Sequence, residues 1–130
     1  FIDGKVESKV TIMHLDVDNL TSRGKTASPY EISSLMFKLY AKMSEFFLSK
    51  KALSFFMGGD NFMVVANSNH RESAEEFIDI IKNELGIELN CGIGTGKTAR
   101  SAVKLATKSL DTIREIRDSG KEKPEIYELT

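Results

Sequence analysis

The amino-acid sequence predicts one α+β domain, in which helices cover a β-sheet that contains antiparallel strands. The chain has 130 residues, close to the usual size of one domain, and 41% of them are hydrophobic, which is enough for one core. Short β-branched runs alternate along it with longer segments whose apolar residues recur at three- and four-residue spacing. No internal repeat or linker interrupts this order, so we expect residues 1–130 to form a single domain.

The first predicted strand covers residues 9–17 and is followed by the polar residues Asp18 and Asn19. A strand of this kind delivers side chains to its carboxyl end. The next element is a helix from residues 28–31 to about residue 49, because Ser-Pro-Tyr-Glu combines an N-cap, a first-turn proline and a capping-box glutamate. Its apolar stripe indicates one buried face.

A β-hairpin is predicted after this helix, because short apolar runs at residues 52–57 and 62–66 are separated only by Gly-Gly-Asp-Asn at residues 58–61. Asn69 and Glu72 have the spacing of a second capping box. The remaining patterns predict four elements: a helix from Asn69 to Gly86, a strand over residues 87–94, a helix from Thr98 to about Gly120, and an edge strand over residues 125–129.

The order of these elements predicts where two acidic residues meet. The first six elements form the split βαβ unit of ferredoxin-like folds. A right-handed crossover makes the first two strands parallel, so the hairpin tip after the second strand lies at the same sheet edge as the end of the first. We therefore expect Asp16 and Asp60 to meet, although 44 positions separate them.

Two carboxylates at one sheet edge indicate a cation site, because they repel each other unless a cation or a proton lies between them. Mg²⁺ suits this sparse set, since it binds one or two carboxylates together with water and substrate phosphates. The backbone carbonyl of Val17 can supply a third ligand. Gly58 and Gly59 have no Cβ atoms, so a base or a phosphate can approach the turn closely. A tight hairpin without a ligand is the alternative for the glycine turn taken alone.

Two sequence motifs resemble those of a known superfamily. Phe-Met-Gly-Gly-Asp-Asn-Phe at residues 56–62, with His-Leu-Asp-Val-Asp-Asn at residues 14–19, resembles the palm superfamily of diguanylate cyclases, class III nucleotide cyclases and type III CRISPR polymerases. Within it, the Gly-Gly-Asp-Asn form and Gly-Ile-Gly-Thr-Gly-Lys-Thr-Ala at residues 92–99 most resemble archaeal GTP cyclohydrolase III. The resemblance implies a ferredoxin-like palm domain. It also implies a Mg²⁺-dependent enzyme that converts GTP into a formylamino-pyrimidine nucleoside monophosphate and pyrophosphate.

The resemblance also implies roles for individual residues. Asp16 and Asp60 match the metal-holding acids, and Val17 matches the residue whose carbonyl faces the metal. Asp18 and Asn19 fall where the palm superfamily cradles phosphates, in the turn after the first strand.

Arg114 resembles the position in the last palm helix where a diguanylate cyclase carries a phosphate-contacting lysine. Arginine is a stronger bidentate partner for phosphate, although a solvated cation at a helix end is an equal alternative. The sequence therefore gives three sets of candidates: catalytic Asp16, Asp60 and Asn61; metal-binding Asp16, Val17 and Asp60; and substrate-binding Asp18, Asn19, Gly58, Gly59 and Arg114.

Two departures from the family pattern change the expectation. Diguanylate cyclases carry an acid at the fourth turn position, whereas Asn61 cannot take a proton from a ribose hydroxyl, so cyclic dinucleotide synthesis is disfavoured. The cyclohydrolase family is built from two tandem palm-like halves, and this chain covers one. We therefore expect a carboxyl-terminal half or a single-domain relative.

The glycine-rich sequence at residues 92–98 looks like a phosphate-binding loop. That signature needs a glycine five residues before Gly96, but position 91 is cysteine. The strand that precedes the loop is expected to run antiparallel to the first strand, which places the loop at the sheet edge opposite the acids. We interpret it as a strand exit and helix cap. The helix that follows returns toward the acids and brings Arg114 and Arg117 near the expected phosphates.

His14 lies two residues before Asp16, on the same face of the predicted strand. It can act there as an acid or a base. The alternative, which the sequence favours, is a partly buried histidine that is hydrogen-bonded in the core.

The composition limits the partners. A formal net charge of −1 leaves no excess of basic residues for extended DNA or RNA, whereas a small phosphorylated ligand needs only a local site. One cysteine and two distant histidines give no zinc-ligand spacing. No apolar run or signal-peptide pattern indicates a membrane, so we expect a cytoplasmic protein. The expected partners are GTP or another purine nucleoside triphosphate, Mg²⁺, and a second palm half or further copies of the chain.

Three functions remain open at this point. The first is a Mg²⁺-dependent GTP cyclohydrolase. The second is a nucleotide cyclase or oligonucleotide polymerase that uses the same metal platform with a ribose hydroxyl as nucleophile. The third is a nucleotide-binding module without catalysis.

Overall fold

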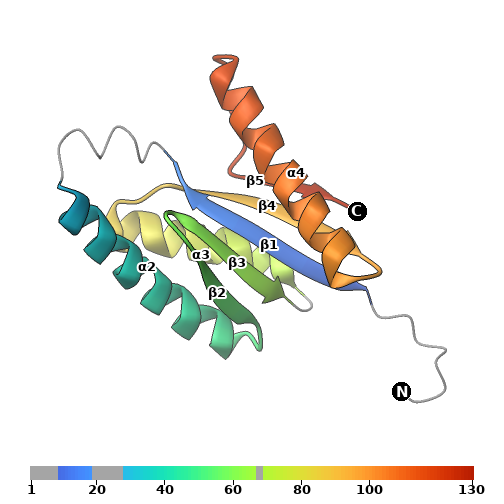
Figure 1. Ribbon diagram of the computed structural model, residues 1–130, viewed down its shortest axis with the longest axis horizontal. Coiled ribbons are helices and arrows are strands. Elements are labelled where there is room, and N and C mark those ends of the chain that lie inside the picture. The colour runs from blue at the N-terminus through green and yellow to red at the C-terminus, as the bar shows by residue number, and fades with distance from the viewer. Residues whose placement is uncertain (1–8, 19–27, 67–68) are drawn as a thin grey trace.

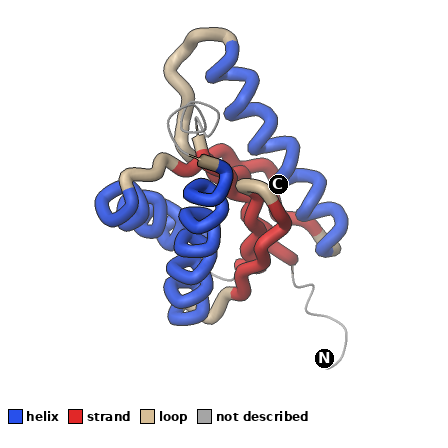
Figure 2. Tube along the Cα trace, turned by 60° about the vertical axis from the view of Figure 1, so that its left-hand side comes forward, coloured by secondary structure: helices blue, strands red, loops and turns tan. Residues whose placement is uncertain are grey.

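Five strands and three helices alternate along the part of the chain that the computed structural model describes, which is residues 9–18, 28–66 and 69–130. In chain order they are β1 (Val10–Val17), α2 (Pro29–Ser49), β2 (Leu53–Gly58), β3 (Asn61–Ala66), α3 (His70–Leu85), β4 (Leu89–Gly96), α4 (Ala99–Asp118) and β5 (Ile126–Leu129). Figure 1 shows α2 and α3 on one face of the sheet and α4 on the other, and Figure 2 shows these layers from a second direction. The predicted α+β class is confirmed.

The strands lie in the order β2-β3-β1-β4-β5, with β1 in the centre. β1 is antiparallel to both of its neighbours, β3 and β4. The predicted edge strand β5 is present and runs parallel to β4, with Ile126 beside Cys91. This is the strand arrangement of the split βαβ unit that the sequence predicts.

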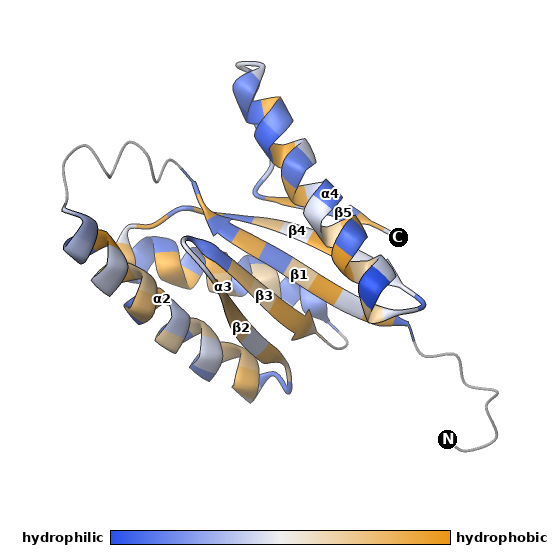
Figure 3. Ribbon diagram, viewed as in Figure 1, coloured by the Kyte–Doolittle hydropathy of each residue, from blue (hydrophilic) through white to orange (hydrophobic). Residues whose placement is uncertain are grey.

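The side chains of β1 alternate between the two faces of the sheet, as the period of a strand requires. Met13, Leu15 and Val17 are buried in the larger core, which α2 and α3 cover. Ile12 belongs to a smaller cluster with Ala106 of α4. Figure 3 shows bands of different hydropathy along β1. Side chains in register with Ile12 therefore face α4.

Two of the three helices begin with the caps that their sequences suggest. Ser28 and Glu31 form the predicted capping box of α2, and Thr98 caps α4 with Ser101 as its partner. The capping box predicted for α3 is wrong, because Asn69 has a φ of 62° and its side chain makes no capping bond. An N-cap side chain reaches the first turn from extended backbone, which the left-handed conformation does not provide. None of the helices in the described ranges is long and apolar enough to cross a membrane.

The hairpin of β2 and β3 sets the position of its turn. β3 pairs antiparallel with β1 so that Phe62 lies opposite Leu15, and β2 pairs antiparallel with β3. The tip at residues 58–61 consequently lies at the edge of the sheet where β1 ends. The predicted meeting of this turn with the end of β1 is confirmed.

The glycines of β4 bring α4 close to the sheet. A Cβ atom on Gly92 would collide with the backbone of Ala106 and Leu110, and one on Gly94 would collide with the backbone of Ala102 and Ala106. Backbone atoms of a helix cannot move aside as the end of a flexible side chain can. These glycines therefore allow the backbones of α4 and β4 to pack in direct contact.

The loop after β4 lies away from the acidic edge. Gly96 pairs with Val10, the first residue of β1, whereas the acids follow the other end of that strand. Thr98 then caps α4. The interpretation of this glycine-rich segment as a strand exit and helix cap is confirmed.

We predict that Gly94→Ala lowers the free energy of unfolding by at least about 2 kcal/mol, because the added methyl group meets helix backbone. Gly120→Ala is the matched control. Gly120 has a φ of 81° but open space around it, so its substitution should cost only about 1 kcal/mol of backbone strain. Urea unfolding measures both. Equal losses for the two variants would contradict the packing role of Gly94.

Candidate functional site

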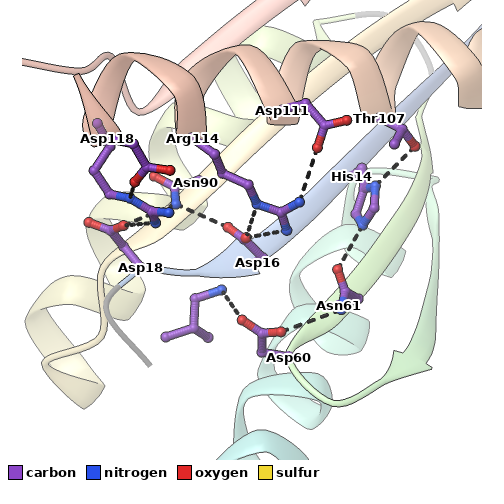
Figure 4. Close-up of polar contacts among 12 residues, drawn as sticks. His14, Asp16, Asp18, Asp60, Asn61, Asn90, Thr107, Asp111, Arg114 and Asp118 are labelled. Carbon is purple, nitrogen blue, oxygen red and sulfur yellow. Dashed lines mark hydrogen bonds and ion pairs between the residues drawn. The ribbon is translucent and has the colours of Figure 1, made fainter. Parts of the chain in front are cut away.

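Asp16, Asp18 and Asp60 lie at one edge of the sheet, with Asp111 and Asp118 of α4 beside the arginines that contact them (Figure 4). Asp16 lies at the end of β1 and Asp18 directly follows this strand, and both contact side chains of α4. Asp60 comes from the hairpin turn, and its Oδ2 atom lies 3.4 Å from the backbone nitrogen of Val17. The structure therefore brings Asp16 and Asp60 together, as the strand order predicts.

Asp16 is buried and is already paired with a cationic side chain. Its Oδ2 atom accepts hydrogen bonds from Arg114 Nη2 at 2.6 Å and Nε at 3.0 Å, and its Oδ1 atom accepts one from Asn90 Nδ2 at 3.0 Å. Only 4% of Asp16 is exposed. A buried carboxylate needs such a partner, because an uncompensated charge in a region of low dielectric is costly. Arg114 supplies that partner.

Asp60 is half-buried and has weaker partners. Its carboxylate accepts from the backbone of Val17 and from Asn61 Nδ2, both at 3.4 Å. No ion pair to Asp60 is present among the described residues. Burial, and then the negative charge of Asp16, raise the pKa of Asp60 above its ordinary value of 3.8. A cation beside Asp60 would relieve both effects.

The protein ligands available for a metal ion at this edge are few. The described part of the chain holds no cluster of three or more His, Cys, Asp or Glu side chains that could bind a metal. The oxygens of Asp16 and Asp60 are hard ligands of the kind that Mg²⁺ prefers, and Mg²⁺ commonly completes its shell with water and phosphate. The residues thus fit a nucleotide-bound Mg²⁺. Coordination by the Val17 carbonyl stays a prediction.

Asp18 holds two further cations. Its carboxylate lies 3.2 Å from Arg117 Nη1 and 3.5 Å from Lys123 Nζ, and it accepts from Asn90 Nδ2 at 3.3 Å. Burial acts to raise the pKa of Asp18, but the Asn90 hydrogen bond and the charges of Lys123 and Arg117 outweigh it, so the pKa lies below 3.8. Its predicted contact with substrate stays a prediction. The structure itself shows Asp18 in contact with two basic side chains, Arg117 and Lys123.

Asn90 and Lys123 are site residues that the sequence did not indicate. Asn90 of β4 is fully buried, and its Nδ2 donates to both Asp16 and Asp18 while its Oδ1 accepts from Lys123 Nζ at 2.7 Å. A polar amide inside an otherwise apolar strand was the available signal. Lys123 follows α4 in a polar segment and had no such signal. Arg114, Arg117 and Lys123 together place three cations at the acidic edge.

The glycine turn beside the acids adopts backbone conformations that favour glycine. Gly58 and Gly59 are exposed and have φ values of 99° and 59°, and a Cβ atom built on Gly58 would meet no atom of the described residues within 4 Å. The predicted approach of a base or a phosphate to this backbone stays a prediction. Asn19 lies outside the described residues, and its predicted phosphate contact is a prediction only.

His14 is hydrogen-bonded through both ring nitrogens. Nε2 lies 3.0 Å from Asn61 Oδ1, and Nδ1 lies 3.2 Å from Thr107 Oγ1 of α4. Figure 4 shows His14 between these two side chains, with Asn61 next to Asp60. This is the hydrogen-bonded histidine that the sequence favours. It also connects to the acidic edge through Asn61.

Solved structures with the same fold include nucleotide cyclases. The GGEEF domain of a diguanylate cyclase from Vibrio cholerae matches with a TM-score of 0.63 and 17% identity, covering 95% of this chain and 85% of that one. A bacterial light-regulated adenylyl cyclase matches with a TM-score of 0.67 and 12% identity, covering 83% of this chain and 71% of that one. These likenesses show that the fold is that of the palm domain in these cyclases, which confirms the predicted palm-type fold.

Sequence relatives are more specific. GTP cyclohydrolase III of Methanocaldococcus jannaschii is 39% identical over 113 residues, which are 84% of this chain and 41% of the relative. GTP cyclohydrolase III of Methanococcus maripaludis is 35% identical over 121 residues, which are 92% of this chain and 44% of the relative. The chain thus spans less than half the length of these relatives. The sequence model of GTP cyclohydrolase III matches residues 2–125, and the chain belongs to that family.

Proposed function

We propose that this chain binds GTP together with Mg²⁺ at the edge where Asp16 and Asp60 meet. In the proposed reaction one water opens the imidazole ring of GTP at C8, and a second water cleaves the bond between the α- and β-phosphates, which gives a formylamino-pyrimidine nucleoside monophosphate and pyrophosphate. Membership of the GTP cyclohydrolase III family supports this choice of substrate and reaction.

One observation carries the proposal: two acids from separate elements lie at an open glycine turn, with three basic side chains beside them. Asp60 has a raised pKa because burial and Asp16 disfavour its charge. Arg114, Arg117 and Lys123 reach the same edge from α4 and the segment after it. Acids for a metal and cations for phosphates are both needed to hold a nucleoside triphosphate with its Mg²⁺.

Each side chain has a defined part in this proposal. Asp16 and Asp60 would hold Mg²⁺, which when bound polarises phosphate oxygens and favours the departure of pyrophosphate. Arg114 would pass from Asp16 to the phosphates, since a guanidinium binds phosphate in the same forked manner as carboxylate. Arg117 and Lys123, held by Asp18, would add positive charge next to the triphosphate. The open backbone at Gly58 would admit the ligand.

The chain is also expected to work with a second palm half or a further copy. Its relatives are more than twice as long as the part that it matches. On edge strand β2, Leu53, Phe55 and Met57 are exposed on one face of the sheet. A partner that covered them would bury apolar surface. This pairing stays a prediction.

We predict that the chain converts GTP with Mg²⁺ to pyrophosphate and a ring-opened pyrimidine, detected by mass spectrometry. Asp16→Asn and Asp60→Asn should each lower the rate by more than about 100-fold, since loss of a direct metal ligand costs more than loss of a residue behind it. Asp79→Asn, on the exposed side of α3, is the control and should leave the rate unchanged.

The products distinguish the competing functions. Joined nucleotides with intact purine would replace the proposal with a polymerase. Calorimetric binding of GTP without turnover would replace it with a binding module. If the wild-type chain neither converts nor binds GTP, and Asp16→Asn behaves in the same way, the proposed nucleotide site is contradicted.

A second prediction concerns the charge of Asp60. At neutral pH without divalent cation, Asp60→Asn should raise the free energy of unfolding, because it removes a half-buried charge beside Asp16. The folded-state pKa of Asp60 is raised, so this destabilisation is present above that pKa and disappears below the ordinary value of 3.8. The advantage of the variant should therefore vanish as the pH falls toward 3.8.

Urea unfolding over a range of pH measures this advantage. Added Mg²⁺ at neutral pH should also reduce it, because the cation stabilises the wild-type chain and not the variant. A variant that is less stable than the wild type at neutral pH without cation would contradict the prediction.

A third prediction separates the contact of Arg114 with Asp16 from its proposed contact with phosphate. Arg114→Gln should bind Mn²⁺ alone several-fold more tightly, because Asp16 loses its internal cation, and should bind GTP several-fold more weakly, because a phosphate partner is lost. Arg117→Gln is the matched control. Arg117 pairs with Asp18, so its loss should weaken GTP binding without strengthening Mn²⁺ binding. Calorimetry measures both affinities, and weaker Mn²⁺ binding by Arg114→Gln would overturn the exchange.

A further inference from the structure

Four polar side chains from three parts of the fold form a continuous line that ends at Asp60. Thr107 Oγ1 lies 3.2 Å from His14 Nδ1, and His14 Nε2 lies 3.0 Å from Asn61 Oδ1. Asn61 Nδ2 in turn donates to Asp60 Oδ1 at 3.4 Å. The line thus joins helix α4, strand β1 and the hairpin turn (Figure 4).

The direction of each hydrogen bond in the line follows from the direction of the bond to Asp60. The Asp60 carboxylate can only accept, so the amide of Asn61 must turn its NH₂ group toward Asp60 and its oxygen toward His14. That oxygen also only accepts, so His14 Nε2 must carry a proton. In a neutral imidazole the other nitrogen, Nδ1, then accepts, and the hydroxyl of Thr107 can donate to it. Every group in the line finds a partner of the right kind.

The Asp60 carboxylate needs these side-chain contacts because the backbone of the turn restricts its direction little. It follows two glycines with positive φ values, and a Cβ atom on Gly58 would meet no atom within 4 Å in the part of the chain that the structure describes. Glycine allows the widest range of backbone conformations, so the turn by itself does not fix the direction of the carboxylate. His14 lies on the central strand and Thr107 on α4, which are rigid elements that can fix it.

We propose that Thr107, His14 and Asn61 are positioning residues, which hold the Asp60 carboxylate in the orientation that binds the divalent cation. The inference rests on the proposed function, because it concerns the same cation site. It gives His14 a role through Asn61 and not as an acid or a base. It also accounts for an amide at position 61, since a carboxylate there would repel Asp60 and could not donate to it.

The tautomer of His14 is the first test. Long-range ¹H–¹⁵N correlation spectra of the wild-type chain at mildly alkaline pH should show the proton on Nε2 and none on Nδ1. A proton on Nδ1 alone would reverse the line, place Asn61 Oδ1 against the carboxylate, and overturn the proposal.

The affinity for Mn²⁺, measured by electron paramagnetic resonance of the free ion, is the second test. His14→Leu should weaken Mn²⁺ binding by roughly 10-fold or more, as is typical when a residue behind a metal ligand is lost. His14→Gln should restore most of the affinity, because its amide can donate to Asn61 from a similar position. Thr107→Val should weaken binding less than His14→Leu does.

Controls separate positioning from general stability. Thr112→Val is matched to Thr107→Val, because the Thr112 hydroxyl donates only along its own helix, to the Lys108 carbonyl, and its loss should leave Mn²⁺ binding unchanged. His14→Leu combined with Asn61→Ala should bind Mn²⁺ no more weakly than either single variant, since both remove the same line. A thermal unfolding curve of each variant verifies that it is folded.

The outcomes distinguish this proposal from the proposed function. A wild-type chain that binds no Mn²⁺ overturns both. A wild-type chain that binds Mn²⁺, with His14→Leu and Thr107→Val binding it equally well, overturns only the positioning line. Additive losses in the double variant would do the same, because they would show two independent effects.

Discussion

The repulsion between two carboxylates at one sheet edge is the constraint around which this site is organised. Asp16 and Asp60 come from parts of the chain that are distant in sequence. The strand order brings them to the same edge of the sheet. Asp16 is compensated by Arg114 and Asn90, whereas Asp60 has only weak hydrogen bonds. The negative charge is therefore unevenly balanced. The proposed cation would then arrive with its ligand and would not be held permanently by the protein.

Side chains of helix α4 balance most of the negative charge at this edge. Glycines in the neighbouring strand β4 determine how closely the helix packs against the sheet. Gly92 and Gly94 allow the helix backbone to lie directly on β4. From that position Arg114 reaches Asp16 from the last turns of the helix, and Thr107 reaches His14 from its middle. The segment that resembles a phosphate loop thus contributes through packing, at a distance from the acids.

Buried polar groups tie the separate parts of the site into one network. Asn90 contacts Asp16, Asp18 and also Lys123, so the orientation of these two acids and the position of one cation depend on the same amide. No buried side-chain nitrogen or oxygen atom among the described residues lacks a hydrogen-bond partner, which is the condition for a buried network to stabilise a defined geometry. His14 and Asn61 extend the network to the hairpin turn. The acids of β1 and the acid of the turn are thereby held by different sets of side chains.

The amino-acid sequence by itself determined the element order, the α+β class and the meeting of Asp16 with Asp60. Apolar periodicity, caps and turn residues are local signals, and the handedness of a crossover is nearly invariant, so few topologies remained. The tertiary structure decided which side chains surround the acids. Asn90, Lys123 and the contacts of His14 depend on the register of β4 and on the path of α4 across the sheet. Packing of the whole core sets both, and no local pattern encodes them.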